Sequence, residues 1–117
     1  MIYTSYFSKM EKMTEEEKSR CIGIVAYIPK FLSGKIKNID ELAPKKKTLS
    51  DYKNNHNKEE YTRLYLKQLK ELTAEKIIEL IPEDAILLCY ESSEKFCHRH
   101  LLAEFLKQHG IDIEEYH

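Results

Sequence analysis

Cysteine, histidine and arginine stand side by side at Cys97-His98-Arg99, directly before an apolar pattern of helical period. Basic neighbours and a helix N-terminus favour the thiolate form of a cysteine, so Cys97 is a candidate nucleophile. The same helix end offers backbone N–H groups and the bidentate fork of Arg99, which suit a phosphate or carboxylate. Glu91, just after an apolar run, is a candidate general base or a partner for a ribose hydroxyl. The segment therefore predicts an anion-binding site, with Cys97 and Glu91 as candidate catalytic groups.

Each of these side chains also has a structural interpretation. Free cysteine is among the most buried residue types, so Cys97 can be a packed thiol. His98 lies four residues before Leu102 on the apolar face of the helix, where most histidines pack and make a hydrogen bond. Arg99 can pair with Glu91 and hold the intervening loop closed. The sequence therefore leaves open whether the protein is an enzyme.

Cys89, Cys97 and His98 are also ligand types that Zn²⁺ prefers. Their spacing, Cys-x₇-Cys-His, is not that of a zinc knuckle or ribbon. A fourth ligand would have to come from Glu91, His56 or His100. We predict no metal site, leave the cofactor unknown, and keep a zinc-stabilised structural domain as an alternative.

Apolar patterning predicts the elements that position these residues. Two of the expected strands are apolar throughout, as in strands that a parallel sheet buries on both faces. The last expected strand lies at an edge of the sheet. The expected strands span residues 2–7, 22–28, 85–90 and 111–113. Capping patterns and apolar spacings of three and four predict helices over residues 14–20, 57–72, 73–82 and 98–109. Residues 30–57 show no sustained period and are expected to form a long excursion, of the kind that is often functional.

Strands separated by helices imply right-handed βαβ units. The expected fold is α/β, with a mainly parallel, Rossmann-like sheet of about four strands and helices on both faces. Ligands bind such sheets at the carboxyl ends of the strands, so the residues there should converge with the Cys-His-Arg segment. The predicted ligand-binding residues are Ser5, Tyr6, Tyr27, Cys89, His98 and Arg99.

Composition limits the class of protein. The chain has 117 residues, 42% of them hydrophobic, which predicts one domain spanning residues 1–117. Three cysteines are too few for a disulfide scaffold, and the N-terminal segment lacks the apolar run of a signal peptide. The longest near-apolar run, residues 21–29, is too short to cross a bilayer. We therefore expect a reduced, cytoplasmic protein without a membrane partner.

Charge is unevenly distributed along the chain. Residues 30–70 carry eleven basic and five acidic side chains, whereas residues 71–117 carry four basic and eleven acidic ones. Such asymmetry can mark an anion-binding face, and Tyr6 and Tyr27 can stack on a planar ring. We therefore predict a small anionic, nucleotide-like or phosphate-bearing ligand. A module that binds a protein or nucleic acid through the basic excursion at 30–57 is the alternative, although a pI of about 6.5 disfavours a dedicated nucleic-acid binder. The oligomeric state is not indicated.

The segment LLCYE at residues 87–91, followed by FCHR at residues 96–99 and an apolar helix, resembles the signature of the domain of unknown function 488 family of small α/β proteins. Residues 2–5, IYTS, are similar to that family's first strand. Many members have Asp-x-Arg at the end of the second strand, where this chain reads AYI at residues 26–28. The resemblance implies a fold and a residue cluster, and no established reaction.

Overall fold

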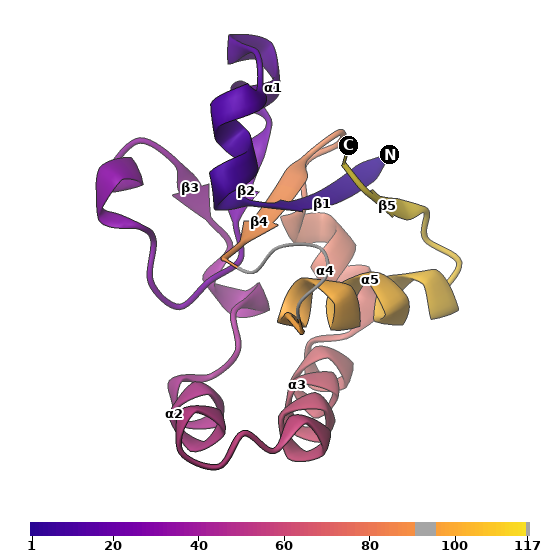
Figure 1. Ribbon diagram of the computed structural model, residues 1–117. Helices are drawn as coiled ribbons and strands as arrows, with labels where there is room; N and C mark the ends of the chain where they lie inside the picture. Colours follow the sequence, from indigo (N-terminus) through magenta and orange to yellow (C-terminus); the bar gives the residue numbers. More distant parts are fainter. Residues whose placement is uncertain (91–95, 117) are drawn as a thin grey trace.

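The computed structural model describes residues 1–90 and 96–116, which fold around a twisted sheet (Figure 1). Five strands lie in the order β3-β2-β4-β1-β5, and every neighbouring pair is parallel. The strands are β1 (Ile2–Tyr6), β2 (Cys21–Gly23), β3 (Lys37–Asn38), β4 (Ile86–Cys89) and β5 (Ile113–Glu115). The α/β class and the parallel sheet are therefore confirmed, with one strand more than the four expected.

Helices cover both faces of the sheet. The α-helices are α1 (Glu15–Ser19), α2 (Lys46–Asn55), α3 (Lys58–Leu72), α4 (Ala74–Leu80) and α5 (His98–Gln108). Short 3₁₀ segments are η1 (Phe7–Lys12), η2 (Lys30–Leu32) and η3 (Asp40–Leu42). Helices α2 to α5 lie on one side of the sheet, and α1 lies on the other side (Figure 1). Among the described residues, no helix combines the length and apolar character that a membrane span requires.

The predicted caps fix several helix ends. Thr14 and Glu17 form a capping box at α1, in which each side chain accepts a hydrogen bond from the other residue's backbone N–H. The Asn57 side chain accepts from the N–H of Glu60 and begins α3. Gly110 follows α5 with a φ of +78°, a left-handed conformation that glycine adopts without steric cost. The predicted positions of these helices are confirmed.

The strand expected over residues 22–28 is wrong in its length, because β2 ends at Gly23. Beyond it, the side chain of Asn38 accepts from the N–H of Val25 at 3.1 Å and donates to its carbonyl at 2.8 Å. A side chain therefore replaces the neighbouring strand as the partner of the Val25 backbone. Ile24 and Val25 stay buried, so the apolar run marks the core without marking a strand.

The interpretation of residues 30–57 as an irregular excursion is also wrong, because they hold β3 and α2. Helix α2 begins after Lys45, which makes no side-chain capping hydrogen bond, so the usual sign of a helix start is missing. Thr48 is its one buried residue, and Leu49 and Tyr52 are only partly buried. The helix covers the edge of the core with a weak apolar stripe, and its period is correspondingly hard to recognise.

Two apolar clusters stabilise the sheet, one on each face. The larger cluster joins residues of β1, β2, β4 and β5 to α3, α4 and α5, with Leu69, Ile77, Leu87 and Leu102 fully buried. The smaller cluster includes Phe7, Met13, Cys21 and Leu88. Strand β4 pairs with β1 on one side and β2 on the other, and its last residues, Leu88 and Cys89, are fully buried.

Gly23→Ala is expected to lower the free energy of unfolding by about 1 to 2 kcal/mol through overpacking. A Cβ at this position would lie 2.5 Å from Oδ1 of Asn38 and 2.8 Å from Cδ1 of Ile28. Asn38 cannot move without releasing the Val25 backbone. Urea unfolding monitored by circular dichroism measures the change. The control is Gly34→Asn. Gly34 has a φ of +75°, which asparagine tolerates, and a Cβ at this position would have nothing within 4 Å. A Gly23→Ala variant as stable as the control would contradict the prediction.

Candidate functional site

A cavity of about 470 Å³ opens beside the carboxyl ends of β2 and β4. Val25 and Tyr27 follow β2, Tyr90 follows β4, and both segments line the cavity. Helix α2, Tyr61 of α3 and the start of α5 also line it. The position agrees with the rule that parallel sheets bind ligands where their strands end.

Five aromatic rings of described residues line the cavity. They belong to Tyr27, Tyr52, Tyr61, Tyr90 and Phe96. The rings of Tyr52 and Tyr61 lie 5.2 Å apart, and each contacts the ring of Phe96 at centroid distances of 5.7 and 5.2 Å. Burial, with a smaller contribution from Tyr52, raises the pKa of Tyr61, so its phenol stays protonated at neutral pH. The wall therefore carries several aromatic faces that are inclined to one another.

Two cations from α2 complete the wall. Lys46 and Lys53 both line the cavity, and Nζ of Lys46 lies 5.2 Å from the centroid of the Tyr27 ring. Both lysines belong to the basic segment 30–57 of the alternative interaction module, but neither they nor the rings of Tyr52 and Phe96 were among the predicted ligand-binding residues. Once α2 is recognised, the spacing of seven residues between Lys46 and Lys53 places both on one helix face, and this signal could have found them.

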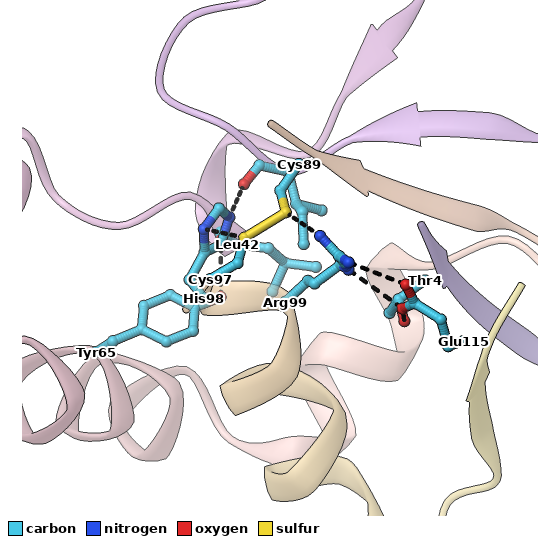
Figure 2. The surroundings of a disulfide bond; sticks show 9 residues. Thr4, Leu42, Tyr65, Cys89, Cys97, His98, Arg99 and Glu115 are labelled. Carbon is cyan, nitrogen blue, oxygen red and sulfur yellow. Dashed lines mark hydrogen bonds and ion pairs between the residues drawn. A yellow bond between two sulfur atoms is a disulfide. The ribbon is translucent and has the colours of Figure 1, made fainter. Parts of the chain in front are cut away.

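The two cysteines next to the cavity are joined. Cys89 ends β4, Cys97 precedes α5, and the structure links them as a disulfide with Cα atoms 7.4 Å apart (Figure 2). Cys97 lines the cavity and is 6% exposed, whereas Cys89 is completely buried. The expectation that all three cysteines are reduced thiols differs from the structure, in which Cys21 is the free one. Spacing could not show this, because the pairing depends on where β4 and α5 meet.

Arg99 is fully buried behind the cysteine pair. Its Nη1 donates to Sγ of Cys89 at 2.7 Å, and its Nη2 donates to Oε2 of Glu115 at 2.9 Å (Figure 2). Nε donates to the other oxygen of Glu115 at 3.2 Å, which makes the pair bidentate. Thr4 also donates to this carboxylate, at 2.8 Å. Arg99 therefore connects the sulfur at the end of β4 to the acid on β5.

Glu115 stays ionised in this position. Burial on its own raises the pKa of Glu115, but hydrogen bonds from Arg99 and Thr4 outweigh it and hold the pKa below its usual value. Sequence reasoning missed Glu115 because it lies sixteen residues beyond Arg99, on a strand whose place beside β1 only the fold reveals.

His98 is buried between the sheet and α3. Its Nε2 contacts the carbonyl oxygen of Ile24, and its ring packs edge-on against Tyr65 with centroids 5.5 Å apart. A carbonyl only accepts, so Nε2 carries the proton and Nδ1 faces Sγ of Cys97, 3.7 Å away. Burial lowers the pKa of His98 to about 4, so the ring is neutral at pH 7. His98 therefore packs in the core and contacts a backbone carbonyl, as its structural interpretation predicts, and it also lines the cavity.

The remaining predicted residues lie in different places. Tyr27 is on the cavity wall and largely exposed, and the hydroxyl of Tyr90 donates to its carbonyl. Tyr6 does not line the cavity, and its ring packs against Arg99 with 5.5 Å between the guanidinium carbon and the centroid. Ser5 is completely buried, and its hydroxyl has no hydrogen-bond partner within residues 1–90 and 96–116. Glu91 lies outside the described residues.

The described part of the chain contains no group of three or more His, Cys, Asp or Glu side chains that could hold a metal ion. Cys89 and Cys97 are bonded to each other, and His98 is engaged with a backbone carbonyl. The zinc alternative gains no support from this arrangement.

Comparison with known proteins identifies a family. A family model described as "DUF488-N3a: Active DUF488-N3 subclade" matches residues 5–110. No curated protein and no solved structure matches the chain significantly. The matched region contains the end of β1, the strands β2 to β4, the helices α1 to α5, the cavity and the cysteine pair.

Proposed function

The chain belongs to the DUF488-N3a family, the active subclade of DUF488-N3, and from this premise we propose that it binds an anionic, nucleotide-like small molecule in its cavity. The observation that carries the proposal is the combination of aromatic walls and two lysines at the carboxyl ends of β2 and β4. A volume of about 470 Å³ lies in the range of cavities that hold small ligands.

The aromatic walls suit a planar ring. Every nucleobase has a π face, and stacking on an aromatic side chain contributes roughly 1 to 3 kcal/mol per base. Tyr27 is exposed on the wall and can stack without rearrangement of the core. The hydroxyl groups of Tyr52 and Tyr61 provide polar contacts at the edge of such a ring.

The cations suit a phosphate. Lys46 and Lys53 lie on the helix that borders the cavity, and lysine binds phosphate as a point charge. Helix α5 begins at His98, so the positive end of its dipole is next to the same space. A ligand with a planar ring and a phosphate fits both halves of the site.

If the bound molecule is processed, Cys97 and Glu91 are the candidate catalytic residues. Cys97 lines the cavity, and the description of the subclade as active supports a reaction. We further propose a cytoplasmic location, because nucleotides are abundant there and the sparse cysteine content is typical of that compartment.

Nucleoside phosphates are expected to raise the Tm of the wild-type protein. At about one hundred times Kd, binding adds roughly 2.7 kcal/mol, which corresponds to roughly 10 °C for a domain of this size. The double variant Lys46→Ala, Lys53→Ala should bind at least about tenfold more weakly, since each factor of ten corresponds to about 1.4 kcal/mol. A thermal-shift series with mono-, di- and triphosphates, an unphosphorylated nucleoside and inorganic phosphate measures both effects.

The matched control is Lys67→Ala, Lys70→Ala, which removes the same charge from exposed positions on α3 that do not line the cavity. This control should keep the wild-type response. The absence of any shift with all these compounds would overturn the proposal. Salt-sensitive binding to a polyanion, without a response to mononucleotides, would favour the alternative interaction module instead.

A further inference from the structure

The two bonded cysteines have different surroundings. Cys97 lines the cavity and is 6% exposed, whereas Cys89 is completely buried and does not line the cavity. Arg99 contacts the sulfur of Cys89, and His98 faces the sulfur of Cys97 (Figure 2). One sulfur is therefore within reach of a small molecule in the cavity, and the other is next to a buried cation.

We propose that Cys89 and Cys97 form a reversible dithiol/disulfide couple, in which Cys97 exchanges with a low-molecular-weight thiol that enters through the cavity and Cys89 is the leaving sulfur. This redox activity goes beyond ligand binding and does not depend on it.

Arg99 stabilises Cys89 as the leaving group. Its guanidinium, which stays protonated in proteins, donates to Sγ of Cys89 at 2.7 Å. A cation at this distance favours a thiolate over a thiol, and a more stable thiolate leaves faster in thiol–disulfide exchange. Glu115 holds the other side of the guanidinium at 2.9 and 3.2 Å, so Arg99 is in position before the bond breaks.

His98 favours the thiol form of Cys97 after reduction. Its neutral ring donates from Nε2 to the Ile24 carbonyl, which leaves the lone pair of Nδ1 directed at Sγ of Cys97. After reduction, the Cys97 thiol can donate to that nitrogen over the observed 3.7 Å. The low pKa of His98, about 4 because of burial, means that the ring does not remove the proton. Cys97 therefore ends as a thiol, while Cys89 ends as a thiolate.

The exchange balances with a dithiol as the reductant. A thiolate of the dithiol attacks Sγ of Cys97, a new S–S bond forms, and the bond between Cys89 and Cys97 breaks with the electron pair going to Cys89. The second thiol of the reductant, after losing its proton, then attacks the reductant sulfur of the mixed disulfide. Cys97 leaves and takes one proton, and the other proton of the dithiol goes to solvent. The dithiol loses two electrons and the cysteine pair gains them.

The fold does not depend on the disulfide to keep the two cysteines adjacent. Helix α5 is attached to the sheet by the pair of Arg99 with Glu115 and by the contact of His98 with the Ile24 carbonyl. Leu102 and Phe105 of the same helix are buried in the larger apolar cluster. The reduced cysteines therefore stay in position for reoxidation, as a reversible couple requires.

Single-cysteine variants test the direction of exchange. On incubation with glutathione disulfide, Cys89→Ser should capture glutathione at Cys97 at least about tenfold faster than Cys97→Ser captures it at Cys89, because access from the cavity outweighs the larger thiolate fraction of the fully buried Cys89. Intact-mass spectrometry and peptide mapping measure both rates, and circular dichroism checks that each variant is folded. Cys21→Ser is the matched control, since burial raises the pKa of Cys21 to about 11 and it lies outside the pair. In this variant the link between Cys89 and Cys97 should open and re-form as in the wild type.

Titration of the wild-type protein tests reversibility. Dithiothreitol should open the link between Cys89 and Cys97 in the folded protein, and glutathione disulfide should restore it. Arg99→Lys keeps the positive charge without the fork and should slow opening by roughly tenfold. A link that never forms, a link that opens only on unfolding, or faster capture at Cys89 than at Cys97 would each overturn the proposal. The cysteine variants decide the question even if Arg99→Lys fails to fold.

Discussion

Arg99→Ala is expected to lower the free energy of unfolding by about 3 to 5 kcal/mol, the cost of removing one partner of a buried ion pair. The Arg99 side chain is fully buried, and that of Glu115 is only 20% exposed. Truncation leaves the Glu115 carboxylate with its hydrogen bond from Thr4 and removes the fork that offsets its desolvation. Urea unfolding with excess reductant, which keeps the cysteines in one state, measures the loss.

An exposed ion pair provides the control for this prediction. Arg63 lies 4.0 Å from Glu60 on the surface of α3, and both side chains are largely solvated. Arg63→Ala should therefore cost less than about 1 kcal/mol. Arg99→Lys should fall between the two, because it keeps the charge but loses the bidentate geometry. A loss below about 1 kcal/mol for Arg99→Ala would show that the buried pair does not stabilise the fold.

Acidification is expected to destabilise the protein by roughly 2 to 3 kcal/mol between pH 7 and pH 4.5 through His98 alone. In the unfolded chain a histidine binds its proton as the pH falls through about 6.5. In the folded chain, burial lowers the pKa of His98 to about 4. Between these values the unfolded state binds more protons, so stability is full above pH 6.5 and falls as the pH decreases towards 4.

His98→Gln isolates this contribution. The glutamine side chain can still donate to the Ile24 carbonyl, but it does not titrate. The lowered pKa of Glu115 also makes the fold less stable in acid, and that part is common to both proteins. The loss of stability between pH 7 and pH 4.5 should therefore be smaller in the variant. Equal losses in the wild type and in His98→Gln would contradict the burial of a neutral imidazole.

Much of the sheet and four of its helices, α1, α3, α4 and α5, could be predicted from local signals. The apolar run at β4, the Thr14 and Asn57 caps and Gly110 after α5 all act over a few residues. Each signal has a local physical cause. The apolar run reflects burial on both faces of the sheet, the caps satisfy backbone N–H groups, and the glycine permits a left-handed turn. The position of the cavity followed from the same elements through the geometry of parallel sheets.

The contacts inside the site could not be predicted in this way. Asn38 replaces a strand as the partner of Val25, and Glu115 pairs with Arg99 from a different strand. Each contact joins segments that the topology brings together, so no spacing in the sequence marks it. The two lysines of α2 that line the cavity were not predicted for a related reason. Helix α2 has no side-chain cap at its N-terminus, and it buries too few residues to show a recognisable apolar period.

The strand order has a consequence for how the chain assembles. Strand β1 lies between β4 and β5, and its partner residues on both strands follow it by more than eighty residues. Pairing β1 with either strand therefore closes a long loop of the chain. Closing such loops costs entropy before any contact compensates for it, which slows folding. During synthesis β1 emerges first and waits unpaired at both edges for several seconds, while about one hundred further residues are added. Helix α3, with its own cap and local contacts, can form in that interval, and the sheet is completed around β1 only afterwards.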